Sequence, residues 1–321
     1  MSDCKVSVIV PVYNIRRFIG ECLRSLMSQT MKEVEYIIVD DCSADGSYDA
    51  VMEMVAGRPD FIVVRHERNL GLPAARNTGL EMASGEYIIH CDGDDFMEPE
   101  MVEKLYECAV RNKADMVWCD WYLSFTDSER YMKQPTFTNG HDAVISMLRG
   151  SMKYNVWNKL SRRSLYDGLT FPAGRSMGED MTMIKIAAKA GVTAHVPEAL
   201  YHYRRTNTEA LTQNYSPRKL KEIKENTLDT VEFLRACSEV SDVDVKRFLL
   251  NVKLPFLFTG KREDIKRWQE WFPEANSEIL GNKNQSIRVR LLQWCASKGL
   301  QWVNILYYNL VQRVVYGKLY K

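Results

Sequence analysis

The feature that most constrains the fold is an alternation of short hydrophobic runs and amphipathic segments over the first 121 residues. Five runs rich in β-branched and aromatic residues predict strands, at residues 6–12, 35–40, 61–65, 86–92 and 114–121. Residues 16–30 and 99–112 carry apolar side chains three or four positions apart, which predicts helices. Strands that are apolar at nearly every position and alternate with helices indicate an α/β fold with a mostly parallel sheet.

Polar residues follow the expected strands, at the edge where parallel sheets bind ligands. The first strand ends in "PVYN", the second in "DDCSADGS", the third in "HERNLGLPAARNTG" and the fourth in "CDGDD". The last stretch places Asp92, Asp94 and Asp95 within four positions, with Gly93 allowing close approach of a ligand. Two explanations stay open: a DxD pair that shares a divalent cation with a diphosphate, or an aspartate that caps the helix expected near Glu98.

Two common phosphate-binding loops are missing from the sequence. It contains no GxxxxGK[ST] motif, and no GxGxxG follows the first strand. A P-loop enzyme and a dinucleotide-binding dehydrogenase are therefore disfavoured. A nucleotide bound without a glycine-rich loop needs side chains for its base and a metal ion for its phosphates.

Six stretches taken together resemble one known family. "VSVIVPVYN", "YIIVDDCSADGS", "NLGLPAARNTGL", "YIIHCDGDD", "WNKL" and "GEDM" follow one another in the order and spacing of the family 2 glycosyltransferases. The resemblance covers roughly residues 5–210. It implies a GT-A fold, Rossmann-like with a mostly parallel sheet flanked by helices, and inverting transfer from a nucleotide sugar; a helical extension follows it.

The resemblance also implies roles at the nucleotide sugar. Asp41 would accept a hydrogen bond from a uracil imide, Asp92 would face the ribose, and Asp94 would hold Mg²⁺ or Mn²⁺ together with Asp92. Asp95 would keep the helix-capping role. His202 is a further candidate metal ligand, set against a structural role for a lone histidine in an aromatic strand. The residues expected to bind the nucleotide sugar are Pro11, Tyr13, Asp41, Asn69, Arg76, Asp92, Gly93 and Arg204.

The "ED" pair of "GEDM" is the expected catalytic centre. In the family, a carboxylate in this place removes the proton of the acceptor hydroxyl while that oxygen attacks the anomeric carbon. Asp180 is the expected base and Glu179 the adjacent alternative. A plain first-turn helix acid is the structural alternative for both.

Two departures from family patterns bear on the reaction. Cys42 stands where glycine is frequent in the family, and this small substitution puts little of the resemblance in doubt. The stretch "DIKRW" (264–268) is the nearest approach to the QxxRW motif of processive synthases and lacks its glutamine. With no membrane span in the sequence either, transfer of a single sugar is expected rather than polymer synthesis.

The rest of the chain is expected to be mainly helical. The predicted divisions are a catalytic domain at 1–212, with a nucleotide-binding half at about 1–120 and an acceptor half at about 121–212, a helical region at 213–282 and a tail at 283–321. No acidic residue follows Glu278, whereas this stretch holds seven basic ones: Lys283, Arg288, Arg290, Lys298, Arg313, Lys318 and Lys321. An interfacial helix on an anionic membrane, or a helix packed against this chain or another subunit, would each explain such a tail.

These observations predict a glycosyltransferase that moves one hexose or N-acetylhexosamine from a UDP-sugar to a glycan hydroxyl, free or lipid-linked, in cell-surface polysaccharide synthesis. The eight cysteines form no CxxC pair or zinc pattern, which suits the cytoplasm or the inner face of the cell membrane, and no nucleic-acid partner is expected. Two alternatives remain: a sugar-1-phosphate nucleotidyltransferase and a non-catalytic, membrane-associated protein that binds a nucleotide sugar or glycan.

Overall fold

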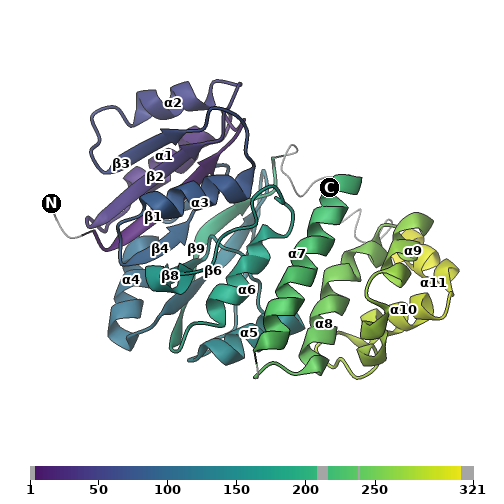
Figure 1. Cartoon of the computed structure of the whole chain (residues 1–321). Helices are drawn as coiled ribbons and strands as arrows, with labels where there is room; N and C mark the ends of the chain where they lie inside the picture. Colours follow the sequence, from purple (N-terminus) through teal and green to yellow (C-terminus); the bar gives the residue numbers. More distant parts are fainter. Residues whose placement is uncertain (1–3, 208–215, 238, 312–321) are drawn as a thin grey trace. The chain divides into compact units, whose positions relative to one another are not determined.

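The hydrophobic runs of the amino-terminal half form strands of one mixed sheet in the computed structural model, which describes residues 4–207, 216–237 and 239–311. The strand order in the described residues is β3-β2-β1-β4-β8-β6-β9-β5, with β7 beside β6. Figure 1 labels β1 to β4, β6, β8 and β9 of this sheet. The strands are β1 (Val6–Val12), β2 (Val34–Asp40), β3 (Phe61–Arg65), β4 (Tyr87–His90), β5 (Phe96–Met97), β6 (Met116–Ser124), β7 (Glu129–Met132), β8 (Lys159–Arg162) and β9 (Thr193–Arg204).

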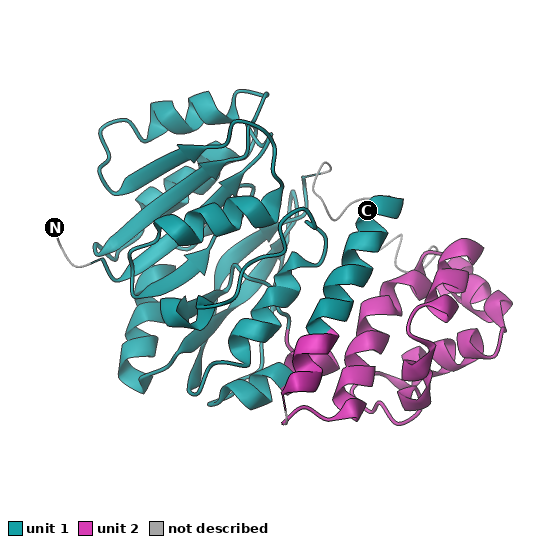
Figure 2. Ribbon diagram, viewed as in Figure 1, with its two compact units in different colours: residues 1–144, 153–230 teal, residues 145–152, 231–321 magenta. Residues whose placement is uncertain are grey.

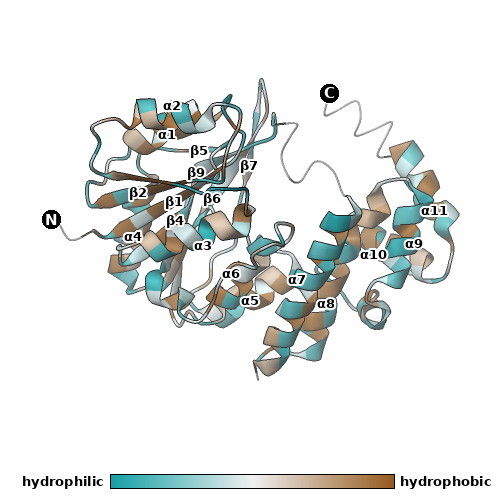
Figure 3. Cartoon of the chain, turned by 45° about the horizontal axis from the view of Figure 1, so that its top comes forward, coloured by the Kyte–Doolittle hydropathy of each residue, from teal (hydrophilic) through white to brown (hydrophobic). Residues whose placement is uncertain are grey.

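The parallel part of the sheet matches the prediction from periodicity. The pairs β1–β2, β1–β4, β2–β3 and β6–β9 are parallel. Every residue of β1 is buried, as expected for a strand covered on both faces, and the middle of this part of the sheet is brown, the hydrophobic colour, in Figure 3. The antiparallel strand β8 lies between β4 and β6, so the carboxyl ends of those two strands still face the same edge.

Helices flank this sheet. Helix α1 buries Ile19, Cys22, Leu23 and Leu26, the stripe that its sequence predicts. Helix α3 packs on β1 and β2, and α4 packs on β6 and β9. In chain order, and including those that do not flank the sheet, the helices of the described residues are α1 (Ile19–Met27), α2 (Ser47–Met54), α3 (Leu72–Met82), α4 (Met101–Asn112), α5 (Gly140–Arg149), α6 (Thr182–Ala187), α7 (Pro217–Ala236), α8 (Asp242–Lys253), α9 (Arg262–Glu270), α10 (Ile287–Ser297) and α11 (Gln301–Tyr307).

The chain divides into two compact units (Figure 2). Unit 1 comprises residues 1–144 and 153–230 and contains the sheet; unit 2 comprises 145–152 and 231–321 and is helical. Within unit 2, Arg149 Nε donates to Asp244 Oδ1 at 2.8 Å, which ties the end of α5 to α8. The unit boundary at 230 differs from the sequence boundaries at 212 and 282, which stay predictions.

None of the helices in the described part of the chain is long and apolar enough to cross a bilayer. Helix α7, the longest at 20 residues, is amphipathic and strongly charged. The part of the predicted tail at 312–321 lies outside the described residues, together with its three basic side chains.

Candidate active site

The loop after β4 holds the three clustered aspartates in three different environments. Asp95 is buried: its Oδ2 accepts from the Tyr201 hydroxyl at 2.8 Å, and its Oδ1 accepts from the Arg204 backbone N–H at 2.8 Å. Helix α4 begins after Glu100, which makes no side-chain capping bond. The expected capping role of Asp95 is therefore wrong, because the carboxylate turns inward to join this loop to β9.

Asp94 and Asp92 are half-buried and close enough to affect one another. Burial, and after it the charge of Asp92, raises the pKa of the Asp94 carboxyl. Asn207 Nδ2 donates to Asp94 Oδ2 at 2.7 Å. Two hard oxygen donors of like charge fit a divalent cation, which would relieve their repulsion. In the described residues no group of three His, Cys, Asp or Glu side chains forms a complete metal cage.

Gly93 allows the loop to pack tightly under the end of β1. A Cβ at this position would lie 2.5 Å from Ile15 Cδ1 and 3.0 Å from the Pro11 carbonyl oxygen. In the structure, Gly93 therefore permits close packing against Ile15 and Pro11 of the same chain. The roles of Gly93 and Pro11 toward a ligand stay predictions.

Arg76 contacts Asp92 and is itself only 2% exposed. Its Nη2 donates to Asp92 Oδ1 at 2.9 Å and lies 3.4 Å from Glu179 Oε1. Opposite charges on both sides stabilise the buried guanidinium and raise its pKa despite the opposing effect of burial. One side chain therefore connects the loop after β4 with the "GED" turn, although Gly93 and Glu179 are 86 residues apart in the sequence.

The "GED" turn presents two adjacent acids with different exposure. Gly178 has φ +79°, and residues 179–181 form a 3-10 turn that leads into α6. Glu179 is buried and Asp180 is half-buried, so Asp180 is the more accessible carboxylate. Burial raises the pKa of both carboxyls, and the positive charge of Arg76 opposes this rise. Asp180 is thus the better-placed base, although its catalytic role stays a prediction.

Helix α7 bonds to this turn, and β8 places a charged side chain where it interacts with Asp180. Helix α7 contributes Asn226, whose Nδ2 donates to the Met177 carbonyl oxygen at 2.8 Å, and Glu222, whose Oε2 accepts from the Met177 N–H at 3.2 Å. Lys159 of β8 is fully buried, and its Nζ donates to Asn158 Oδ1 at 2.8 Å. Burial lowers the pKa of Lys159 to about 7, and the Asp180 charge opposes that shift.

The expected uracil acceptor, Asp41, is buried at the end of β2. Its Oδ1 accepts from Leu70 N–H and its Oδ2 from Gly71 N–H, each at 2.8 Å, and His66 Nδ1 lies 2.7 Å from Oδ1. These bonds hold the 66–71 loop in place. The contact of Asp41 with a nucleotide base stays a prediction. Cys42 follows with φ +63°, the left-handed conformation that explains why glycine suits this position.

Tyr13 and Asn69 are exposed and stay predicted nucleotide contacts. Arg204, at the end of β9, lies close to the DGDD loop: its Nε donates to the Asp94 carbonyl oxygen at 2.8 Å. The guanidinium also lies over the rings of Phe18 and Phe96, at 5.4 and 5.2 Å from their centroids. It is therefore held beside the aspartates, and its contact with a diphosphate stays a prediction.

His202 has partners at both ring nitrogens. Nε2 lies 2.9 Å from Glu98 Oε1, and Nδ1 lies 2.7 Å from Glu129 Oε1. The ring stacks on Phe96 and Tyr122, with centroids 4.2 and 4.9 Å away. This arrangement favours the structural role over metal ligation, because each nitrogen already faces a carboxylate.

Sequence reasoning missed two side chains that shape the site. The Tyr201 hydroxyl joins two of the aspartates, donating to Asp95 and accepting from the Asp92 backbone N–H at 3.1 Å. Asn207 holds Asp94. Tyr201 lies within "YHYRR" and Asn207 lies just after it. Both are close in sequence to Arg204, an expected site residue, and this proximity could have indicated them.

A comparison with protein families agrees with this geometry. Residues 7–184 match the family described as glycosyl transferase family 2, which is more than half of the chain. The chain therefore belongs to the family 2 glycosyltransferases, as the sequence resemblance predicted.

Relatives in this family include proteins from two Bacillus species. EpsH of Bacillus subtilis, a glycosyltransferase by name, is 33% identical over 225 residues, which cover 67% of this chain and 64% of EpsH. A poly(ribitol-phosphate) beta-glucosyltransferase of Bacillus spizizenii is 27% identical over 271 residues, covering 82% of this chain and 41% of that protein. This chain thus spans just under two thirds of EpsH and less than half of the second relative.

Solved structures confirm the fold. TarS residues 1–349 of S. aureus, crystallised with UDP-GlcNAc, matches with a TM-score of 0.68 and 20% identity over 96% of this chain and 91% of that one. The expected GT-A fold, with its mostly parallel sheet, flanking helices and helical carboxyl-terminal region, is therefore correct.

Proposed function

We propose that this protein is an inverting glycosyltransferase that transfers one sugar from a UDP-sugar to a hydroxyl group of a glycan. The observation that carries the proposal is the buried bridge from Asp92 through Arg76 to Glu179, because it brings the acids expected at the donor next to the acids expected at the acceptor. Asp92, Asp94 and Asp180 are only half-buried, so their carboxylates are accessible to a ligand.

Asp180 would act as the general base. Its carboxylate takes the proton of the acceptor hydroxyl as the acceptor oxygen forms a bond to the anomeric carbon from the side opposite the diphosphate. The bond from that carbon to the diphosphate oxygen breaks, and UDP leaves with the electron pair. Displacement from the opposite face inverts the anomeric centre.

Asp94, with Asp92 beside it, would hold a divalent cation, Mg²⁺ or Mn²⁺. Such a cation supplies positive charge that neutralises the diphosphate leaving group. Burial, and after it the charge of Asp92, raises the pKa of Asp94, and a cation bound between the two carboxylates would offset both effects. Arg204 is tied to the same loop and would add charge near the diphosphate.

The donor and acceptor classes rest on the relatives. The structural neighbour TarS was crystallised with UDP-GlcNAc, which supports a UDP-linked hexose or N-acetylhexosamine as donor. The relative named poly(ribitol-phosphate) beta-glucosyltransferase supports a glycan or other polyhydroxyl polymer as acceptor, and a role in cell-surface polysaccharide synthesis. Such a role would place the protein in the cytoplasm or on the inner face of the cell membrane.

Release of UDP tests the proposal. The wild-type protein is expected to release UDP from at least one UDP-sugar when Mn²⁺ or Mg²⁺ and an acceptor are present. Asp180→Asn should lower kcat by roughly a hundredfold to ten-thousandfold, the usual loss when a general base is removed. Asp94→Asn should raise the concentration of cation needed for half-maximal rate.

Asp127→Asn is the matched control, because it removes an exposed carboxylate and should leave the rate unchanged. Equal turnover in the wild type and in both Asp94→Asn and Asp180→Asn would refute the assigned roles.

A further inference from the structure

Helices α10 and α11 of unit 2 each expose a row of large apolar side chains. On α10 these are Ile287 (67% exposed), Leu291 (53%) and Trp294 (38%), at intervals of four and three residues. Trp302 (63%) and Leu306 (48%) lie four residues apart on α11. Residues spaced in this way share one face of a helix, so each helix presents an apolar stripe to solvent.

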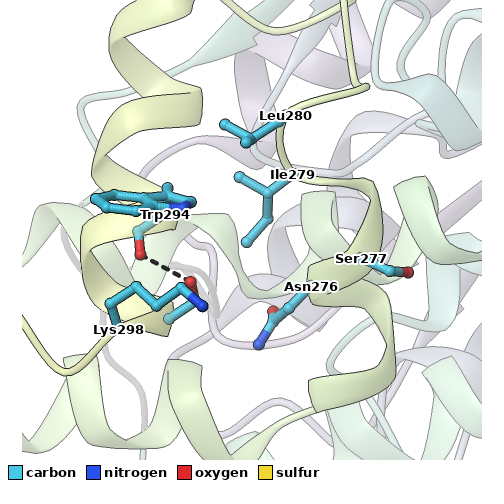
Figure 4. Close-up of a pocket in the computed structure, with 7 residues that line it drawn as sticks. Asn276, Ser277, Ile279, Leu280, Trp294 and Lys298 are labelled. Carbon is cyan, nitrogen blue, oxygen red and sulfur yellow. Dashed lines mark hydrogen bonds between the residues drawn. The ribbon is translucent and has the colours of Figure 1, made fainter.

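The stripe on α10 borders a cavity lined by a second exposed leucine. Leu280, which is 57% exposed, lines a cavity of about 320 Å³ together with Trp294 and Lys298. Figure 4 shows Leu280, Ile279 and Trp294 around this space, with the Lys298 side chain near the indole. A tryptophan beside a lysine, next to apolar side chains, is a combination typical of the interface between lipid headgroups and acyl chains.

The segment that carries these stripes has charged side chains of one sign. Residues 279–311 carry Lys283, Arg288, Arg290 and Lys298 and no acidic side chain. Lys283 and Lys298 are exposed. Packing of two copies through this surface would bring like charges together, whereas an anionic surface would gain from them.

We propose that the α10–α11 surface, defined as Leu280, Lys283, Ile287, Leu291, Trp294, Lys298, Trp302 and Leu306, binds an anionic lipid membrane. The apolar stripes insert at the level of the headgroups, and the lysines contact acidic lipids. This inference extends the location given under the proposed function, and it does not depend on catalysis because every residue involved lies in unit 2.

Sedimentation of the full chain with lipid vesicles tests the surface. Vesicles that contain phosphatidylglycerol should pull down the protein, vesicles of phosphatidylcholine alone should do so much less, and added salt should weaken binding. Lys283→Gln and Lys298→Gln should each lower the partition coefficient about fivefold, the effect of one basic residue near an anionic surface. The double variant Leu291→Ser/Trp302→Ser should lower it at least about tenfold through lost insertion.

Val110→Ser is the matched control, since Val110 is 55% exposed on α4 of unit 1 and lies outside the surface. It should bind vesicles as the wild type does. Thermal unfolding should be the same for the wild type and for both serine variants, because all the changed side chains are exposed.

Absence of wild-type binding to phosphatidylglycerol vesicles would overturn the proposal, as would equal binding by Leu291→Ser/Trp302→Ser and Val110→Ser. A wild-type dimer in solution that this double variant converts to a monomer would overturn it in favour of a second copy as the occupant. UDP release measured without vesicles separates these outcomes from a failure of the proposed enzyme activity.

Discussion

At the scale of single residues, Arg76 is the side chain on which the two halves of the site converge. Its Nη2 reaches Asp92 and Glu179, while its Nε and Nη1 have no hydrogen-bond partner among the described residues. A guanidinium holds its nitrogens in a rigid plane, whereas an ammonium is a compact charge at the end of a flexible stem. This geometry favours a positioning role, in addition to or in place of the nucleotide contact that the family resemblance implies.

Arg76→Lys should therefore lower kcat, because the lysine keeps the buried charge and loses the two-sided contact. The dissociation constant of UDP, measured by calorimetry, should change less than about threefold if Arg76 acts only through Asp92 and Glu179. A rise in that constant of tenfold or more would instead support direct contact with the nucleotide. Thermal unfolding of the variant distinguishes either result from general loss of structure.

The pH dependence of the reaction follows from the environment of Asp180. Burial raises the pKa of this carboxyl, the charge of Asp92 adds to the rise, and Arg76 and Lys159 oppose it. A base works only when deprotonated, so kcat/KM should fall as the pH falls through this raised pKa. The midpoint of the acid limb should lie above the ordinary aspartate value of about 3.9. A profile that stays flat down to that value would contradict Asp180 as the base.

At the scale of secondary structure elements, helix α7 matters to the site because it holds the backbone of the "GED" turn. Asn226 donates to two carbonyl oxygens, those of Met177 at 2.8 Å and Arg175 at 3.2 Å. The turn has only one short 3-10 segment of its own, so such bonds from a neighbouring helix fix where Asp180 points. The sequence of α7, in which nine of 20 residues are charged, did not indicate this role.

Asn226→Ala should leave those carbonyl groups without their buried donor, which costs about 1–3 kcal/mol of stability. We also expect kcat to fall, because the turn that carries Asp180 loses its support. Leu228→Ala is the control on the same helix: Leu228 is 49% exposed, and its loss should change stability by less than about 0.5 kcal/mol. Equal kcat values for the two variants would show that α7 does not position the turn.

The sequence located some elements well and missed others, among them helices α2 and α3. Periodicity located β1, β2, β3 and β4, together with α1 and α4, to within a few residues. It missed β5, β7 and β8, which have two to four residues each. Such strands bury too few side chains to leave a pattern, and they form because a neighbouring strand offers unpaired backbone groups.

At the scale of the whole molecule, the division into units shows why boundaries are hard to infer from composition. Residues 145–152 lie in unit 2, because Arg149 pairs with Asp244 and the Leu148 carbonyl oxygen accepts from Asn251. These contacts join positions about a hundred residues apart along the chain. No local change in composition marks them, whereas the loss of acidic residues after Glu278 is visible directly in the sequence.

The fold class and the family could be predicted from the sequence, because buried parallel strands and clustered polar loops leave local patterns. The same loops supplied most of the candidate site residues, and their contacts became known only from the three-dimensional structure. It turned Asp95 inward to Tyr201, gave His202 two carboxylate partners and buried Arg76 between Asp92 and Glu179. The physical reason is that hydrogen-bond partners and burial depend on residues distant in the chain, which periodicity and motif spacing do not report.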